Sequence, residues 1–165
     1  MMEFRLAGKG DLEEICRVVR AAVAYLKAHD IDQWDGIYPA EEHILADIES
    51  RTLHTGILEN RIAVIYTVND ECDVQYRNAA WKYPDREYRV LHRLCVDPAY
   101  QNRGIARRTL AHMENELRES GIGAVRLDVF SRNPYALSLY RNSGYEETGT
   151  AEWRKGSFLL MEKYL

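Results

Sequence analysis

The chain has few cysteines, few prolines and no long apolar run. Its three cysteines, Cys16, Cys72 and Cys95, are an odd number with no CxxC pair, which excludes a disulfide framework and a zinc site of the usual spacing. No apolar stretch approaches the ~20 residues that span a bilayer, and the N-terminal MMEFRLAGKG lacks the basic and apolar regions of a signal peptide. We therefore expect a cytoplasmic protein with no membrane partner and no bound metal.

An excess of basic residues is also absent. The net charge is −4 and the isoelectric point is about 5.8, whereas dedicated nucleic-acid-binding domains carry a basic face. The apolar fraction of 46% and the charged fraction of 29% are typical of a globular chain. With only four prolines, no internal repeat and no low-complexity linker, the chain is expected to form one domain, 1–165.

The order of expected elements indicates an α/β fold with a mixed sheet. Apolar residues at helical spacing predict helices at 10–30, from Pro39 or Ala40 onward, at 106–120 and at 134–144. Short β-rich runs predict strands at 2–7, 52–59, 61–68, 89–96, 123–130, 145–150 and 158–165. Asn60 is expected to form a hairpin turn, and the polar, aromatic stretch 70–88 a long loop.

The helical patterns also predict local contacts. Asp11 and Glu14 have the spacing of a capping box at the start of the first helix. The helix at 106–120 is expected to bury Ala106, Thr109, Leu110, Met113 and Leu117 and to expose His112, Glu114, Glu116 and Arg118. Cys16 and Cys95 lie within apolar patterns, so we expect them to be small buried side chains.

The stretch VDPAYQNRGIARRTL, residues 96–110, places a glycine where a strand turns into a helix. Gly104 lacks side-chain bulk, and a helix start offers unpaired N–H donors and the positive end of a dipole. The stretch is neither a Walker A loop nor a dinucleotide fingerprint, because GxxxxGK[ST] and GxGxxG are both absent. Spacing alone leaves two interpretations open, an anion-binding site and an ordinary helix cap.

Two motifs, taken together, resemble the GNAT superfamily of N-acetyltransferases. The first, QNRGIA at 101–106, is similar to the superfamily's acetyl-CoA-binding core Gln/Arg-x-x-Gly-x-Gly/Ala. The second, SRNPYALSLYRNSGYEETG, is similar to its Asn…Ala…Leu-Tyr-x-x-x-Gly-Phe/Tyr segment and follows at the expected distance. The matching residues of this second motif are Asn133, Ala136, Leu139, Tyr140, Gly144 and Tyr145.

The resemblance implies the GNAT fold, whose mostly antiparallel sheet splays open between its fourth and fifth strands after a bulge, and it implies acetyl-CoA as cofactor. The backbone of Leu94, Cys95 and Val96 would pair with the pantetheine arm, and Asn133 would bond that arm as well. The pyrophosphate would lie against the N–H groups from Asn102 to Ala106, with added charge from arginine. The residues assigned to this end of the cofactor are Gln101, Asn102, Arg103, Gly104, Ile105, Ala106, Arg107 and, as a further source of charge, Arg108.

Acetyl transfer to an amine needs an acid for the leaving thiolate and a base for the amine. The resemblance places Tyr140 near the thioester sulfur, and a phenol stays protonated at neutral pH, so Tyr140 is the candidate acid. The backbone N–H of Val96 is the candidate donor to the thioester carbonyl. His92 is the candidate base, because it lies two residues before Leu94 and titrates near neutrality. Glu71 and a water chain are the open alternatives.

The acceptor amine is expected to bind where aromatic and acidic residues cluster. The aromatic candidates are Trp34, Tyr38, Trp81, Tyr83 and Tyr88, and the acidic ones are Asp32, Asp35, Glu71 and Asp73. Each aromatic residue has a packing role as its alternative. The acceptor class is a primary amine of a small molecule or of a peptide, and a homodimer is compatible with the resemblance.

Two other functions are compatible with the sequence. One is a domain that binds CoA without catalysis, against which Tyr140 argues, because a binding module needs no acid there. The other is a regulatory nucleic-acid binder that uses the arginines of 103–108, against which the net charge argues.

Overall fold

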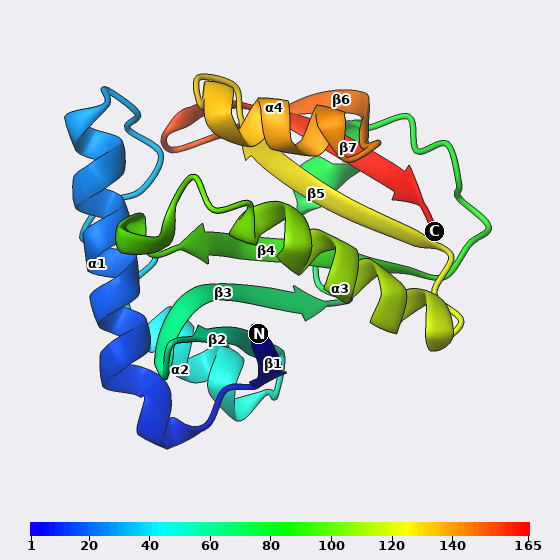
Figure 1. Cartoon of the computed structure of the whole chain (residues 1–165). Coiled ribbons are helices and arrows are strands. Elements are labelled where there is room, and N and C mark those ends of the chain that lie inside the picture. Colours follow the sequence, from blue (N-terminus) through cyan, green and yellow to red (C-terminus); the bar gives the residue numbers. More distant parts are fainter. The chain divides into compact units, whose positions relative to one another are not determined.

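The computed structural model describes residues 1–165 (Figure 1). These residues form two compact units. The first unit contains Met1–Val68 and Arg93–Thr109, and the second contains Asn69–His92 and Leu110–Leu165. The seven strands are hydrogen-bonded in the order β1-β2-β3-β4-β5-β7-β6. Strand β4 (Tyr88–Val96) and helix α3 (Ile105–Glu119) each contribute residues to both units.

The first unit contains an antiparallel arrangement of β1 (Glu3–Leu6), β2 (Leu53–Leu58) and β3 (Arg61–Asn69). Glu59 and Asn60, between β2 and β3, both have left-handed backbones with φ of 53° and 60°. Two left-handed residues in a row are what a tight two-residue hairpin turn requires. The hairpin turn expected at Asn60 is thereby confirmed.

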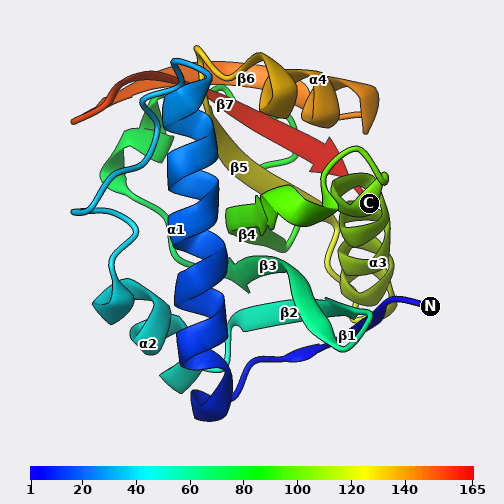
Figure 2. The same cartoon turned by 60° about the vertical axis from the view of Figure 1, so that its left-hand side comes forward.

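Helices α1 (Leu12–Ala28) and α2 (Glu41–Glu49) pack against this part of the sheet (Figure 2). Their buried residues, Ile15, Val18, Val19, Ala22, Ile44 and Ile48, form one apolar cluster with Leu53, Ile62, Ile65 and Cys95. Ile15, Val19, Ala22, Ile44 and Ile48 have the helical spacing from which the two helices were predicted, whereas Val18 lies outside that spacing. None of the helices combines the length and the apolar character that crossing a membrane requires.

The capping box expected at Asp11 and Glu14 is wrong. A 3-10 turn, η1 (Lys9–Asp11), precedes α1, and the Asp11 carboxylate accepts from the Gly8 N–H at 2.7 Å and from Arg5 at 2.8 and 2.9 Å. Glu14 accepts instead from Arg61 Nε at 2.7 Å. The signature fails because both carboxylates are engaged by partners outside the first turn of α1, namely arginine side chains and the N–H groups of Gly8 and Ile62.

In the second unit, β4 and β5 (Ala124–Phe130) run parallel, from Tyr88 opposite Ala124 to Leu91 opposite Leu127. β7 (Gly156–Tyr164) pairs antiparallel with β5 and with β6 (Glu146–Trp153). The sheet is therefore mixed and mostly antiparallel, as expected. Helix α4 (Pro134–Asn142) packs on β5 (Figure 1), and the stretch 70–88 contains a 3-10 turn, η2 (Val74–Asn78).

The expectation that Glu114 is exposed on α3 is wrong. Its side chain is 6% exposed and accepts from the Tyr145 hydroxyl at 3.0 Å and from Lys163 Nζ at 2.6 Å. A carboxylate is tolerated in such a place only with partners of this kind. Both partners come from residues that follow α3 in the chain, so the helical pattern alone carries no sign of them.

Candidate active site

The turn between β4 and α3 lies in the first unit and is fixed by Asp97. Its carboxylate accepts from the Ala99 N–H at 3.0 Å, within the 3-10 turn η3 (Pro98–Tyr100), and pairs with Arg17 at 2.9 Å. The Asp97 N–H donates to the Ala63 carbonyl at 2.9 Å. Asp97 is 3% exposed, so the turn is anchored on both sides before the glycine motif begins.

The motif's backbone turns left-handed twice, at Asn102 with φ of 61° and at Gly104 with φ of 69°. In proteins generally, a backbone that alternates between left- and right-handed residues can direct successive N–H groups toward one side, where an anion can bind. The Arg108 N–H donates to the Gly104 carbonyl at 3.1 Å. The N–H groups of Ile105, Ala106 and Arg107 precede that bond and have no partner within the helix.

The space beside Gly104 is open, because a Cβ built there meets no atom within 4 Å. A ligand can therefore approach the backbone at this point without displacing a side chain. Open approach, two left-handed residues and the positive end of the α3 dipole together fit a pyrophosphate group.

The side chains around this turn differ in their availability. Arg103 donates to Glu59 at 3.2 Å and lies over the Tyr100 ring at 5.4 Å, so part of its charge is already neutralised. Arg107 and Arg108 are exposed, and Gln101 is half-buried. The Ile105 side chain is 2% exposed in a cluster with Ala63 and Val64, and thus anchors the start of α3 in the core.

Residues 94–96 follow a left-handed residue inside β4. Arg93 has φ of 51°, a conformation that is rare for a residue with a Cβ. Because regular alternation of side chains along a strand is interrupted at Arg93, the two-residue spacing between His92 and Leu94 does not by itself place their side chains on one face. Leu94 and Val96 pack on the cluster that contains Ile105, whereas Cys95 packs on the α1 and α2 cluster.

The second unit holds His92, whose ring contacts define its tautomer. His92 Nε2 lies 2.9 Å from Asn69 Oδ1 and 3.1 Å from the Glu71 carbonyl. Asn69 Oδ1 also accepts the Glu71 N–H at 3.0 Å, which identifies it as the amide oxygen. Two acceptors at Nε2 require a proton there, so Nδ1 is the basic nitrogen of neutral His92. Glu71 meets His92 through its backbone, and its side chain is exposed.

Tyr140 and Asn133 also lie in the second unit, on α4. Asn133 is the N-cap residue, and its Oδ1 accepts from the Ala136 N–H at 3.0 Å. Tyr140 is 8% exposed and packs edge-on against Tyr145, with 5.6 Å between the ring centroids. Burial, and then the charge of Asp128, raises the pKa of Tyr140. Its phenol is therefore protonated at neutral pH, as an acid must be.

Asp128 on β5 is a residue that the sequence interpretation did not select. Its Oδ2 accepts from the Tyr76 hydroxyl at 2.8 Å, and its charge acts on Tyr140 and Tyr76 alike. The signal in the sequence is a single carboxylate in the otherwise apolar end of the strand, LDVF. A carboxylate there needs a partner, and that partner comes from 52 residues earlier in the chain.

The aromatic residues expected to surround the acceptor fall into two groups. Trp34 and Tyr38 lie in the first unit, where the Tyr38 hydroxyl accepts from Arg93 at 2.7 Å. In the second unit Trp81 packs over the Arg126 guanidinium at 4.4 Å and Tyr83 against Tyr164 at 5.2 Å.

The acidic residues expected near the acceptor are divided in the same way. Asp32 and Asp35 belong to the first unit, and Glu71 and Asp73 to the second. The Asp73 carboxylate accepts from the Trp153 indole at 2.9 Å.

The loop that carries Trp81 and Tyr83 is fixed by Glu162 on β7. Glu162 Oε1 accepts from the N–H groups of Lys82 at 2.7 Å and Tyr83 at 3.2 Å, and Oε2 accepts from Arg126 Nε at 2.9 Å. Arg126 also lies over the Tyr88 ring at 3.8 Å. Trp81 and Tyr88 therefore have packing roles around Arg126, which was the alternative for each aromatic residue.

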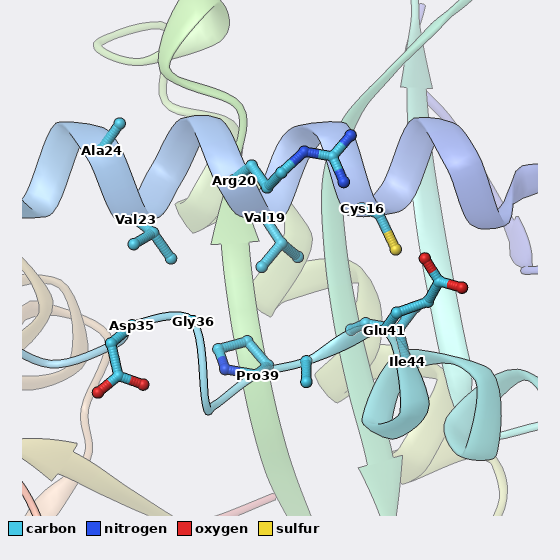
Figure 3. A pocket seen from close by; sticks show the side chains of 11 residues that line it. Cys16, Val19, Arg20, Val23, Ala24, Asp35, Gly36, Pro39, Glu41 and Ile44 are labelled. Atoms are coloured by element: carbon cyan, nitrogen blue, oxygen red, sulfur yellow. The ribbon is translucent and has the colours of Figure 1, made fainter.

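The first unit also contains a cavity of about 370 Å³ between α1 and the segment that leads into α2 (Figure 3). Cys16, Val19 and Val23 point into it from α1, opposite Pro39 and Ile44 (Figure 3). Charged groups lie at its margin, and these are Arg20, Asp35 and Glu41. The cavity is thus apolar inside and charged at its rim, a combination that suits a small amphipathic ligand.

Comparison with known proteins identifies relatives that are acetyltransferases. The model of the acetyltransferase (GNAT) family matches residues 25–145. The N-alpha-acetyltransferase RimI of Mycobacterium tuberculosis is 46% identical over 66 residues, which cover 40% of this chain and 39% of that protein. The [ribosomal protein bS18]-alanine N-acetyltransferase of Escherichia coli is 37% identical over 58 residues, 35% of this chain and 39% of that protein. The chain thus spans well under half the length of these curated relatives.

Solved structures show the same fold over the whole chain. A GNAT-family acetyltransferase from Streptococcus agalactiae superimposes with a TM-score of 0.87 at 22% identity, covering 99% of this chain and 95% of that one. The PaiA N-acetyltransferase of Thermoplasma acidophilum, solved with coenzyme A, gives 0.74 at 20% identity, covering 100% and 99%.

The three free cysteines should differ sharply in reactivity. Burial, and then Asp97, raises the pKa of Cys95 to about 12, and burial raises the pKa of Cys16, whereas Cys72 is exposed. Because the thiolate is the reactive form, iodoacetamide should alkylate Cys72 quickly in the native protein, Cys16, which points into the cavity, more slowly, and Cys95 only after unfolding. Mass spectrometry of a time course measures this. The Cys72→Ser variant should lose the fast phase, and fast alkylation of Cys95 would contradict the packing described.

Proposed function

The chain belongs to the acetyltransferase (GNAT) family, and from this premise we propose that it is an N-acetyltransferase that uses acetyl-CoA to acetylate a primary amine. The acceptor is an amine of a small molecule or of a peptide or protein. The observation that carries the proposal is the start of α3, where Asn102 and Gly104 are left-handed and successive N–H groups have no partner within the helix. The free cysteines are compatible with the cytoplasm as the site of the reaction.

The first unit binds the cofactor in this proposal. The N–H groups from Asn102 to Ala106 hold the pyrophosphate, and Arg107 adds charge beside them. The backbone of residues 94–96 pairs with the pantetheine arm, and the Val96 N–H donates to the thioester carbonyl. When bound, acetyl-CoA supplies an acetyl group already activated as a thioester.

The second unit supplies the proton transfers. His92 carries its proton on Nε2, which donates to Asn69 and to the Glu71 carbonyl. Its Nδ1 therefore accepts the proton that the amine loses. Tyr140, held in its protonated form by burial and by Asp128, gives its proton to the departing sulfur. Asn133 bonds the pantetheine arm from the N-terminus of α4. An acid and a base each contribute about 10²–10⁴-fold to such a reaction.

The relatives suggest a first acceptor to test. The E. coli relative is named for an alanine of ribosomal protein bS18. A short peptide with a free N-terminal alanine is therefore our first probe, and small primary amines follow. The proposed class of acceptor is the amine, and the alanine peptide is one member of that class.

Substitution at Gly104 tests the cofactor site. Gly104→Val adds a branched side chain at φ of 69° and blocks the backbone donors, so isothermal titration should show acetyl-CoA binding weakened by about 10–100-fold. Gly121 is a matched control, because its φ is 83° and a Cβ there also meets nothing within 4 Å. Gly121→Val should lose similar stability and keep its affinity. Equal affinities of the two variants for acetyl-CoA would show that Gly104 is only part of a helix cap.

Removal of the Tyr140 hydroxyl tests the acid. Tyr140→Phe should lower kcat by about 100-fold and leave the Kd for acetyl-CoA within about twofold, because the ring still fills its site. Tyr135→Phe, on the exposed side of α4, is the control and should retain full turnover. Unchanged turnover in Tyr140→Phe would refute the acid assignment. Tight acetyl-CoA binding with no turnover of any amine by the native protein would favour a CoA-binding module.

The base is tested by the pH dependence of kcat/KM. The native profile should fall on the acidic side as the imidazole of His92 gains a proton at Nδ1. His92→Ala should lose activity and that limb together, while Glu71→Gln should keep both, since its carboxylate is exposed and only its carbonyl contacts His92. Retention of the limb in His92→Ala with its loss in Glu71→Gln would assign the base to Glu71.

A further inference from the structure

One side chain in the first unit, Arg93, joins a strand, a helix and the segment between α1 and α2. Its Nε and Nη2 donate to the two carboxylate oxygens of Asp47 on α2, each at 2.8 Å. Its Nη1 donates to the Tyr38 hydroxyl at 2.7 Å. The planar guanidinium fixes the angle between these donors, so the position of Asp47 determines where Nη1 points.

Asp47 is itself immobilised. It is 8% exposed, its Oδ2 accepts from the Thr67 hydroxyl of β3 at 2.8 Å, and its carbonyl accepts from the Thr52 N–H at 3.0 Å. A buried carboxylate with three side-chain donors on its two oxygens cannot rotate without leaving donors unpaired. The Arg93 guanidinium is therefore held in place by the core of the first unit.

The backbone at Arg93 is equally constrained. Its φ of 51° interrupts β4 immediately before Leu94, and left-handed backbone disfavours any residue with a Cβ. Glycine would take this conformation without strain. Arginine at this position therefore accepts backbone strain that glycine would avoid, while its side chain makes the contacts with Asp47 and Tyr38.

Tyr38, whose hydroxyl accepts the hydrogen bond from Arg93 Nη1, belongs to a turn that forms one wall of the cavity. The Asp35 carboxylate accepts from the N–H groups of Ile37 and Tyr38 at 2.9 and 3.0 Å, and the Asp35 N–H donates to the Tyr38 carbonyl at 3.0 Å. Asp35, Gly36, Pro39 and Ala40 line the 370 Å³ cavity beneath α1 (Figure 3). A contact that fixes Tyr38 therefore also fixes this wall of the cavity.

We infer that Arg93 is a positioning residue that fixes, through Tyr38, the 35–40 wall of this cavity for the acceptor amine. The inference rests on the proposed function. The chemistry of the cavity fits such an acceptor, because its inside is apolar and two carboxylates, Asp35 and Glu41, outnumber the one guanidinium, Arg20, at its margin, which favours a cationic amine. Arg93 itself contacts neither the acceptor amine nor the cofactor. Its effect is on binding of the acceptor amine, and it is measured as KM for that amine.

Two variants separate this role from that of an ordinary buried ion pair. Tyr38→Phe removes only the hydroxyl and leaves the Arg93–Asp47 pair intact. Arg93→Lys keeps the charge but cannot donate to both oxygens of Asp47 and to Tyr38 at once. Arg61→Lys is the control, because Arg61 also pairs with a carboxylate, Glu14, but is exposed in the same unit.

The first measurement needs no turnover. In protein labelled with 5-fluorotryptophan, the Trp34 resonance reports on the segment that contains Tyr38, and Trp34→Phe assigns it. Tyr38→Phe and Arg93→Lys should increase the H₂O/D₂O shift of the Trp34 fluorine, because the segment loosens and exposes the ring. Arg61→Lys should leave it unchanged. An unchanged Trp34 shift in both test variants overturns the inference.

The second measurement is steady-state kinetics with the alanine peptide and acetyl-CoA. Each test variant should raise KM for the peptide by about tenfold, with kcat and KM for acetyl-CoA within about twofold. The double variant should have a KM for the peptide no higher than that of the more affected single variant, because both substitutions remove the same hydrogen bond between Arg93 and Tyr38. Equal rises in both KM values, or additive effects, overturn the inference. Absence of turnover of any amine by the native protein refutes the proposed function instead, and the fluorine shift still reports whether Arg93 holds the segment.

Discussion

The buried pair between Arg93 and Asp47 is the interaction on which the first unit is organised. It ties α2 and β3, through Asp47 and Thr67, to the point where β4 turns left-handed. Through Nη1 of Arg93 and the Tyr38 hydroxyl, the same pair also holds the segment that lines the cavity beside α1. A buried ion pair of this kind stabilises a fold little relative to apolar packing, but removal of one partner is costly. Its value is that it specifies one geometry.

The proposed cofactor site depends on backbone more than on charged side chains. The arginines at 103, 107 and 108 are conspicuous in the sequence, yet Arg103 is engaged with Glu59 and Tyr100 and the other two are exposed. The left-handed residues Asn102 and Gly104, by contrast, direct N–H groups whose positions are fixed by the fold. Preorganised donors of this type need no reordering when an anion binds, whereas mobile arginines lose side-chain entropy.

Sequence reasoning was most successful where the determining contacts are local. The helical stripe of α1, the hairpin turn at Asn60 and the glycine turn before α3 each depend on neighbours within a few residues, and periodicity or spacing reveals them. Cys16 and Cys95 were correctly expected to be buried for the same reason. The mixed sheet also agrees with the order of elements, and its mostly antiparallel pairing agrees with what the resemblance to the GNAT superfamily implied.

The expectations that failed depend on distant partners. Glu114 was placed on the exposed face, but its partner Lys163 is 49 residues away. Asp11 and Glu14 looked like a local cap, but arginines at positions 5 and 61 bind them. The left-handed turn at Arg93 was invisible because it is supported by Asp47, 46 residues earlier, and Asp128 was missed because Tyr76 comes from another segment. A polar residue in an apolar pattern signals that a partner exists and does not identify it.

The central claim is acetyl transfer to an amine, and the most direct measurement follows both products at once. The purified protein is incubated with acetyl-CoA and, in turn, with an alanine peptide and a panel of small primary amines. Released thiol and the mass of the amine are recorded together. We expect thiol release that depends on the amine, together with an equal amount of mono-acetylated amine. Thiol release without an acetylated amine, or no product of either kind across the panel, would contradict the claim.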